Sequence, residues 1–234
     1  MEGATAGGHN APPRGPMQLT PAGEPIYGER DAIDPAKFVE IGLPFWLAGG
    51  YGRIGKLKEA LALGATGIQV GTAFAFCEES GFDPAIKTQI IASLQRGDLK
   101  IHTDALASPT GFPFKVAQVP GSIADPLVYQ NRQRICDLGV LRETYQKDDG
   151  SIGFRCAAEP DDIYISKGGE PAQTAGRMCL CNSLCASAGI GQIRDGQPEP
   201  QIITIGDDLE AVRESLLANK NSFTAAEVIE RLLA

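Results

Sequence analysis

Histidine and basic residues are scarce in this chain of 234 residues, which has two histidines and more acidic than basic side chains. The formal net charge of −8 argues against a nucleic-acid partner, because a phosphate backbone needs a basic face. No apolar run approaches the ~18–20 residues of a membrane-spanning helix. Residues 1–15 also lack the positive leader and apolar core of a signal peptide. We therefore expect a cytoplasmic protein that binds neither nucleic acid nor a membrane.

The composition is otherwise that of an ordinary globular protein, with 43% hydrophobic and 21% charged residues. The length permits one large domain or two small ones. Without an export signal, the six cysteines are expected to be reduced thiols.

Three of the cysteines, Cys179, Cys181 and Cys185, have the spacing C-x-C-x₃-C in a region expected to be helical. Zinc sites more usually contain C-x₂-C pairs and a fourth ligand at matching distance, which Cys156 could supply only through folding. The pattern favours small buried thiols that pack a helix, and the same holds for Cys77. The sequence thus predicts no metal site, and it leaves the role of the three cysteines open.

The first part of the chain predicts a strand–helix–strand unit after an irregular start. Residues 1–35 are rich in Gly and Pro and predict a loop with at most one short strand around Ile26. The segments that follow predict helices at 34–41, 56–63 and 83–95, and strands at 45–48 and 67–70. Two strands joined by one helix favour a parallel pair with a right-handed crossover.

The character of the sequence changes after Asp98. Strands are expected at 101–105, 115–119 and 152–156, helices at 125–137, 140–146, 175–188, 208–218 and 224–233, and a turn at 148–150. Residues 201–205 form a β-branched run. The last helix has the clearest start, because Thr224 and Glu227 have the capping-box spacing.

Two strand ends carry small residues that suit an anion. Gly49-Gly50 ends the first predicted strand and Gly71-Thr72 ends the second. Close approach of backbone N–H groups to an anion needs positions without a Cβ, and a helix start and the Thr72 hydroxyl would add to the attraction. Either pair alone is more simply a turn. Together they predict a phosphate site of the kind that late (β/α) loops form.

His9 is the main candidate for proton transfer. Gly7 and Gly8 precede it and would let a flat ligand approach the backbone, while an imidazole can accept a proton near neutral pH. An exposed loop histidine is an equally good local interpretation. His102 is expected to be structural or exposed. The polar run TDALASPTGFPFK, with Ser108, is a candidate substrate-side loop.

These segments resemble a known family. The runs AGGHNAPPRG, LAGGYGRIGKLKEALALGATGIQVGTAFAFCEESG and TDALASPTGFPFKV look like the flavin-dependent nitronate monooxygenases, and CLCNSLCASAGIGQ and ITIGDDLEAVRESLL look like the C-terminal extension of a longer subgroup. The resemblance covers nearly the whole chain, and related flavin enoyl reductases share much of the pattern.

The resemblance implies an α/β fold, the C-terminal portion of a (β/α)₈ TIM barrel followed by a mostly helical extension. Residues 1–97 would be the partial FMN-binding barrel segment, and 98–234 the extension packing on it. The cofactor would be FMN. Residues matching the family's catalytic and flavin-binding positions are His9 as the catalytic histidine, Gly7 and Gly8 near the flavin ring, and Gly49, Gly50, Gly71 and Thr72 at the phosphate.

The implied reaction is the oxidation of a nitronate or nitroalkane by oxygen to a carbonyl compound and nitrite, with His9 assisting deprotonation or orienting the nitronate. Two features depart from the family. Thr5 stands where an acidic residue is usual, and the first four or five barrel strands are absent. We therefore expect the chain to be a fragment that is inactive alone, with a homo-oligomer or a partner chain supplying the missing strands.

Two alternatives remain open at this stage. One is a flavin-dependent enoyl-thioester reductase that takes electrons from NAD(P)H. The other is a non-catalytic flavin-binding or assembly subunit that a partner chain completes.

Overall fold

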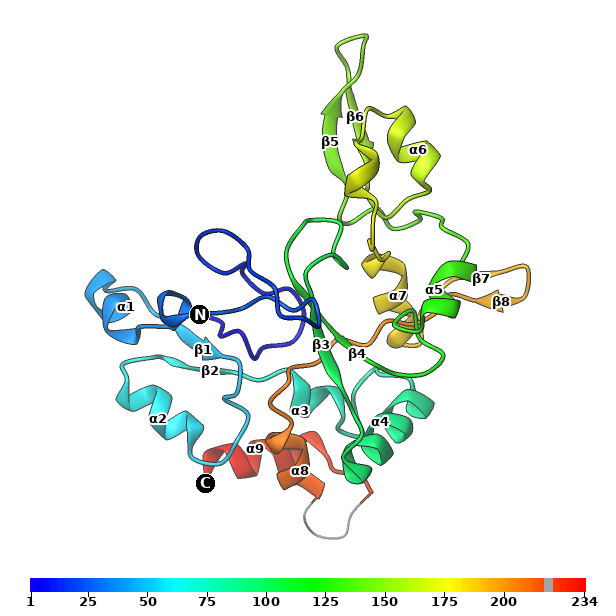
Figure 1. Ribbon diagram of the computed structural model, residues 1–234. Coiled ribbons are helices and arrows are strands. Elements are labelled where there is room, and N and C mark those ends of the chain that lie inside the picture. Colours follow the sequence, from blue (N-terminus) through cyan, green and yellow to red (C-terminus); the bar gives the residue numbers. More distant parts are fainter. Residues whose placement is uncertain (217–220) are drawn as a thin grey trace.

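The computed structural model describes residues 1–216 and 221–234 and has mixed α/β architecture (Figure 1). Its helices are α1 (Pro35–Ile41), α2 (Lys56–Ala62), α3 (Thr72–Ala75), α4 (Pro84–Arg96), α5 (Pro126–Asn131), α6 (Asp161–Ser166), α7 (Leu180–Ser187), α8 (Glu210–Leu216) and α9 (Ala225–Leu233), with 3₁₀ turns at Glu29–Asp31 and Pro171–Gln173. The strands are β1 (Trp46–Ala48), β2 (Gly67–Gln69), β3 (Ile101–Asp104), β4 (Phe114–Ala117), β5 (Glu143–Gln146), β6 (Ile152–Arg155), β7 (Ile193–Arg194) and β8 (Gln197–Pro198).

The strands of the described residues pair in four small sheets. β1 and β2 are parallel, whereas β3–β4, β5–β6 and β7–β8 are antiparallel hairpins. The expected parallel pair with a helix between its strands is therefore confirmed.

The N-terminus extends this parallel arrangement. Ala48 N–H donates to the Met1 carbonyl at 2.8 Å, and Gly3 N–H donates to the Ala48 carbonyl at 3.0 Å. Glu2 forms a parallel bridge to Ala48, so β1 lies between the first residues and β2. Three consecutive parallel segments thus end at one edge, where their following loops meet.

Local capping signals fix several helix starts. The Asp34 carboxylate accepts from Ala36 N–H at α1, and the Asp83 carboxylate accepts from Ala85 N–H at α4. Thr224 and Glu227 form the expected capping box of α9. Gly97 ends α4 in the left-handed region, at φ 76°, which glycine adopts without a Cβ clash.

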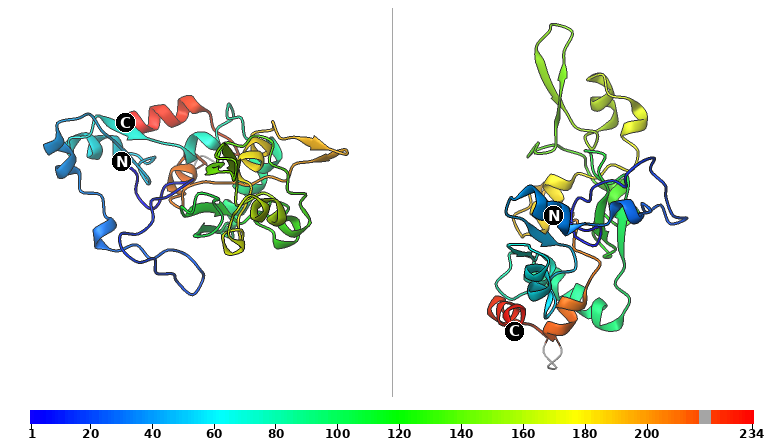
Figure 2. Two further views of the ribbon diagram at one scale, coloured as in Figure 1. Left: turned by 90° about the horizontal axis from the view of Figure 1, so that it is seen from above. Right: turned by 90° about the vertical axis from the view of Figure 1, so that its left-hand side faces the viewer.

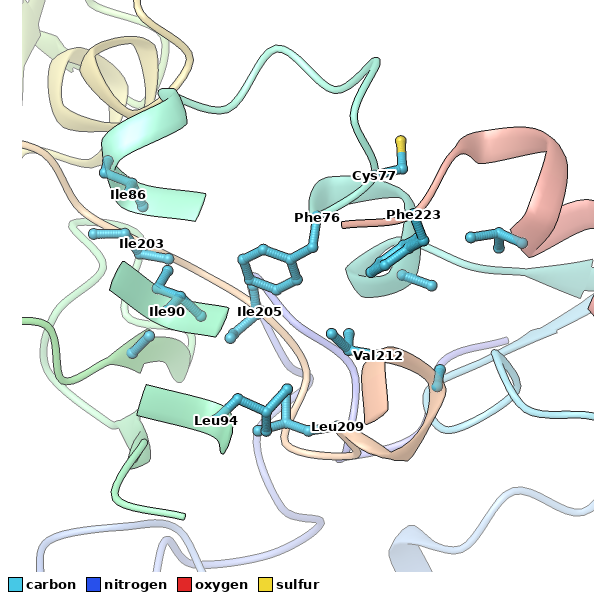
Figure 3. Packing of buried hydrophobic residues seen from close by; sticks show 14 of the residues in the cluster. Phe76, Cys77, Ile86, Ile90, Leu94, Ile203, Ile205, Leu209, Val212 and Phe223 are labelled. Atoms are coloured by element: carbon cyan, nitrogen blue, oxygen red, sulfur yellow. The ribbon is translucent and has the colours of Figure 1, made fainter. Parts of the chain in front are cut away.

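The largest hydrophobic cluster combines residues from distant parts of the sequence (Figure 3). Phe76 lies among Ile90 and Leu94 of α4, Ile205, and Val212 of α8. Ile203 and Phe223 extend the cluster toward α4 and α9. This cluster therefore joins α3 and α4 to residues near the C-terminus, whereas Leu47 of β1 packs in a separate cluster with Phe45, Ala60 and Ala65. The proposed division at residue 97 stays a prediction.

Other expectations about the second half of the chain need correction. Residues 140–146, expected as a helix, form a turn and then β5, because they pair with β6 across the turn at 148–150. The helix expected at 125–137 ends at Asn131, and that expected at 175–188 starts at Leu180. The helix expected at 208–218 starts at Glu210, and its predicted end lies outside the described residues. Sequence reasoning also missed α6 and the β7–β8 hairpin.

The β5–β6 hairpin and α6 project from the rest of the molecule in Figure 1 and in the right-hand view of Figure 2. We call residues 142–177 the hairpin lobe. None of the three hydrophobic clusters of buried residues found in the described chain takes a residue from it. Across the described residues, no helix combines the length and the apolar character needed to cross a membrane.

Candidate functional site

A cavity of about 560 Å³ lies where the three parallel segments end. Its volume is in the range of small-molecule and cofactor sites. All seven residues that the sequence predicted as site residues line it: Gly7, Gly8, His9, Gly49, Gly50, Gly71 and Thr72. The structure therefore brings together three loops that the sequence could only suggest separately.

The loop after β1 has two consecutive left-handed residues, Gly49 at φ 85° and Gly50 at φ 78°. A Cβ on Gly49 would lie 3.1 Å from the Gly3 carbonyl oxygen, so glycine is needed for space as well as for conformation. Within the described part of the chain, the N–H groups of Gly50 and Gly71 form no hydrogen bond. Both groups line the cavity and are free to bind an anion.

The loop that precedes His9 packs against the C-terminal segment. A Cβ on Gly7 would lie 2.6 Å from the Ile205 carbonyl carbon, so the two backbones touch. Gly8 N–H donates to Thr204 Oγ1 at 2.7 Å. Thr204 and Ile205 therefore form one wall of the cavity.

The same C-terminal segment reaches the loop after β2. Gly206 N–H donates to Thr72 Oγ1 at 2.9 Å, which leaves the Thr72 hydroxyl proton for a ligand. A Cβ on Gly206 would lie 2.7 Å from the Thr5 carbonyl oxygen. Residues 204–206 thus join the first and third loops of the site.

His9 is anchored from outside the cavity. Its Nε2 lies 2.6 Å from Ser108 Oγ, and its ring packs edge-on against Phe114 with centroids 4.9 Å apart. Ser108 Oγ also contacts Thr110 Oγ1 at 2.8 Å. Burial lowers the pKa of His9, which keeps the imidazole neutral near pH 7 and able to accept a proton.

Two acidic residues also line the cavity. Asp208 Oδ2 pairs with Arg53 Nε at 3.2 Å and lies 3.1 Å from the position of a Cβ on Gly50. Burial raises the pKa of the Glu2 carboxyl, since it disfavours the charged form. The charge near the glycine loop is therefore mixed, with Arg53 attracting an anion and Asp208 repelling it.

Sequence reasoning missed the C-terminal wall and gave Ser108 another role. Thr204, Ile205, Gly206 and Asp208 line the cavity, whereas Ser108 is fully buried behind His9. The run ITIGDD, a glycine between β-branched and acidic residues, is the signal that could have indicated this wall.

Comparison with known proteins agrees with this geometry. The family model for nitronate monooxygenase matches residues 1–105. A probable nitronate monooxygenase of Bacillus subtilis (strain 168) is 36% identical over 103 residues. Residues 1–105 of the chain are therefore similar to the nitronate monooxygenases. The matched stretch is 44% of this chain and 28% of the length of the Bacillus protein.

Three of the four walls of the cavity lie in the stretch that matches this family, whose members are oxidoreductases and generally flavin-dependent. The loops at 5–9, 49–52 and 69–75 lie inside the matched stretch, whereas residues 204–211 lie outside it. The matched stretch therefore contains His9 and both glycine loops, and the remaining wall comes from the C-terminal part of the chain.

Proposed function

We propose that this chain provides the phosphate-binding loops and the histidine of an FMN site in a nitronate-oxidising enzyme. The observation that carries the proposal is the convergence of His9 and the two glycine loops on one cavity. The free N–H groups of Gly50 and Gly71, the absence of a Cβ at these positions and the Thr72 hydroxyl suit a phosphate group.

The parallel order of residues 1–3, β1 and β2 supports a further part of the proposal. We propose that these segments are consecutive strands of a (β/α)₈ barrel, whose active sites lie at the carboxyl ends of the strands. Barrel closure would then need further strands, and we expect residues 1–234 alone not to turn over substrate.

His9 would handle the proton of a small nitroalkane. In the tautomer in which Nε2–H donates to Ser108 Oγ, Nδ1 accepts the proton from the carbon next to the nitro group. Ser108 and Phe114 hold the ring in one orientation during this transfer. The flavin, when bound, would supply the redox chemistry that passes electrons to oxygen.

A comparison of FMN with riboflavin tests the phosphate site. The two flavins differ only in the phosphate, so the difference in their affinities measures the contribution of the proposed phosphate-binding loops directly. We expect quenching of flavin fluorescence by the purified chain to give a lower dissociation constant for FMN. Equal dissociation constants for FMN and riboflavin, or no binding of either flavin, would contradict the proposal.

Gly71→Val makes this test specific. Gly71 has φ −108°, and a Cβ there would meet no atom within 4 Å, so the substitution fills cavity space without straining the fold. We expect a loss in FMN affinity of about tenfold, equivalent to ~1.4 kcal/mol, with riboflavin unaffected. Gly28→Val is the matched control, since Gly28 is exposed, has φ −117° and also has open space at its Cβ.

The reaction is tested separately. We expect oxygen uptake with propionate 3-nitronate only when the missing barrel strands are supplied, by association or by a longer chain. Turnover by the isolated chain would show that no further strands are needed. Consumption of NAD(P)H with an enoyl thioester, without oxygen uptake on the nitronate, would favour an enoyl reductase.

A further inference from the structure

Behind His9, two hydroxyl groups connect its ring with solvent. His9 Nε2 lies 2.6 Å from Oγ of Ser108, which is fully buried. Ser108 Oγ lies 2.8 Å from Oγ1 of Thr110, which is exposed and is not part of the cavity wall. Both distances are those of hydrogen bonds. A continuous hydrogen-bonded path therefore runs from Nε2 of the ring to the protein surface.

The loop that carries the two hydroxyls is fixed through its backbone. Arg177, the last residue of the hairpin lobe, donates through Nη1 to the Leu106 carbonyl at 2.7 Å and to the Ser108 carbonyl at 2.6 Å. Asp104 Oδ1 accepts from the N–H groups of Leu106 at 2.7 Å and Ala107 at 3.0 Å. These four bonds use no hydroxyl group, so the loop should keep its shape when a hydroxyl is removed.

The hydrogen bonds of Ser108 allow two arrangements of its proton. Thr110 N–H donates to Ser108 Oγ at 3.2 Å, which leaves the hydroxyl one further bond to accept and one to donate. In the first arrangement, His9 Nε2–H donates to Ser108, and Ser108 donates to Thr110 Oγ1. In the second, Thr110 donates to Ser108, and Ser108 donates to an Nε2 without a proton. The tautomer of His9 is thus coupled to the direction of both hydroxyl protons.

The two arrangements leave opposite states at the other ring nitrogen of His9. A neutral imidazole has one N–H, so Nδ1 can accept a proton in the first arrangement and cannot in the second. Burial lowers the pKa of His9, which keeps the ring neutral near pH 7. The tautomer, set by the bond that Nε2 makes, therefore decides whether Nδ1 can act as a base.

The first arrangement depends on the oxygen of Thr110. The Ser108 hydroxyl needs an acceptor there, and Thr110 Oγ1 lies in hydrogen-bond distance. Thr110 Oγ1 also accepts from Phe112 N–H at 3.4 Å, and water can accept the proton of Thr110 because the residue is exposed. Without this oxygen, the buried Ser108 hydroxyl would stay unsatisfied unless it donated to Nε2, and an unsatisfied buried donor is costly.

We propose that Thr110 is a positioning residue that orients the Ser108 hydroxyl and thereby keeps Nδ1 of His9 free to accept a proton. The inference rests on the proposed role of His9 as the group that takes a proton from a nitroalkane. In that step the C–H bond breaks, its electron pair remains on the nitronate, and Nδ1 binds the proton. The ring then carries two N–H groups and one positive charge, and Nε2–H still donates to Ser108.

The test is the tautomer of His9 in the unliganded 234-residue chain, which the ¹⁵N chemical shifts of the two ring nitrogens report. At about pH 8 the ring is neutral, since its pKa lies below 6.5. We expect mainly Nε2–H in the unaltered chain. In Thr110→Val the ratio of Nε2–H to Nδ1–H should fall about tenfold or more, because the Ser108 hydroxyl can then donate only to Nε2. Thr110→Ser keeps the hydroxyl and should restore the ratio of the unaltered chain.

Two controls separate this effect from a general change in structure. Thr144→Val makes the same substitution at an exposed position of β5 and should leave the ratio unchanged. The ring of His102, which lies 3.6 Å from a Glu24 oxygen, should keep its ¹⁵N shifts in every variant. The same ratio for His9 in Thr110→Val and in the unaltered chain, or mainly Nδ1–H in the unaltered chain, would overturn the proposal.

The result is independent of the flavin experiment. The tautomer is measured without a ligand, so equal binding of FMN and riboflavin would contradict the proposed function and leave the role of Thr110 standing. Conversely, an unchanged tautomer in Thr110→Val, together with tighter binding of FMN than of riboflavin, would remove the role of Thr110 alone.

Discussion

His9 and Ser108 are 99 residues apart in the sequence, yet Nε2 of the first lies 2.6 Å from Oγ of the second. Ser108 is fully buried, and its hydroxyl also contacts Thr110. The histidine is therefore held from the protein side, while its ring lines the cavity. A loop histidine without such support would sample many orientations, so this contact is the best structural indication that His9 has a defined role.

The first prediction concerns the protonation of His9. Since burial lowers its pKa, we expect NMR titration of the imidazole Cε1–H signal to give a pKa below the ordinary value of 6.5. The chain has only two histidines, so loss of one signal in His9→Gln assigns the resonance. A pKa at or above 6.5 for His9 would contradict the buried, neutral imidazole described here.

The same shift has a consequence for stability. A histidine whose pKa is lowered in the folded state takes up a proton more readily when the chain is unfolded. Protonation therefore favours the unfolded state over the folded state as the pH falls below 6.5. The stability that neutral His9 permits is complete above that pH and is lost on acidification toward the folded pKa. As the pH falls through this range, we expect the midpoint of urea unfolding to decrease less in His9→Gln than in the unaltered protein.

The second prediction concerns the close approach of Gly7 to Ile205. A Cβ at Gly7 would lie 2.6 Å from a backbone carbon that cannot move independently, so we expect Gly7→Ala to destabilise the protein by about 1–3 kcal/mol. Gly28→Ala is the control, because its Cβ would meet no atom within 4 Å at φ −117°. Urea unfolding compares the two, and equal midpoints would contradict the close packing of the 204–206 wall.

Features decided by a few neighbouring residues could be predicted from the sequence. The helix starts near Asp34, Asp83 and Thr224 each depend on one capping side chain and the first turn of the helix, and the predicted helices that begin there are confirmed. The two glycine loops and His9 were also recognisable, because each has a local pattern. Their position around one cavity agrees with the parallel strand–helix–strand unit.

Features that depend on distant contacts could not be predicted. Residues 140–146 have no strong local preference and become a strand only because β6 pairs with them. The helix from Asp125 ends early, where Arg132 turns to form a buried ion pair with Glu199, with Nη2 and Oε1 2.6 Å apart. The C-terminal wall of the cavity lies some 200 residues from His9, and its place follows from packing of Ile203 and Ile205 in the core.

The third prediction concerns Asp208, the carboxylate beside the glycine loop. Its Oδ2 would lie 3.1 Å from a Cβ on Gly50 and pairs with Arg53, so it would oppose a phosphate bound at the proposed site. We expect Asp208→Asn to strengthen FMN binding several-fold, because it removes the repulsion and frees the guanidinium for the phosphate. Riboflavin binding should not change. Asp162→Asn makes the same chemical change at an exposed position of α6 outside the cavity and should have no effect on either flavin.

The last prediction concerns the buried lysine of β4. Lys115 Nζ is 2.9 Å from Asp207 Oδ2 and donates to Thr103 Oγ1 at 2.7 Å, with the lysine side chain 2% exposed and the aspartate 43%. Loss of the aspartate leaves a buried ammonium without its counter-charge, whereas loss of the lysine leaves a carboxylate that water can reach. We therefore expect Asp207→Ala to destabilise the protein by about 2 kcal/mol and Lys115→Met to cost less. In the double variant the cost should fall below the sum of the two, by about 1 kcal/mol or more in a double-mutant cycle of urea unfolding. Additive costs would show that the pair contributes no coupling, and a larger cost for Lys115→Met would show that packing of the lysine stem, and not its charge, is what the site requires.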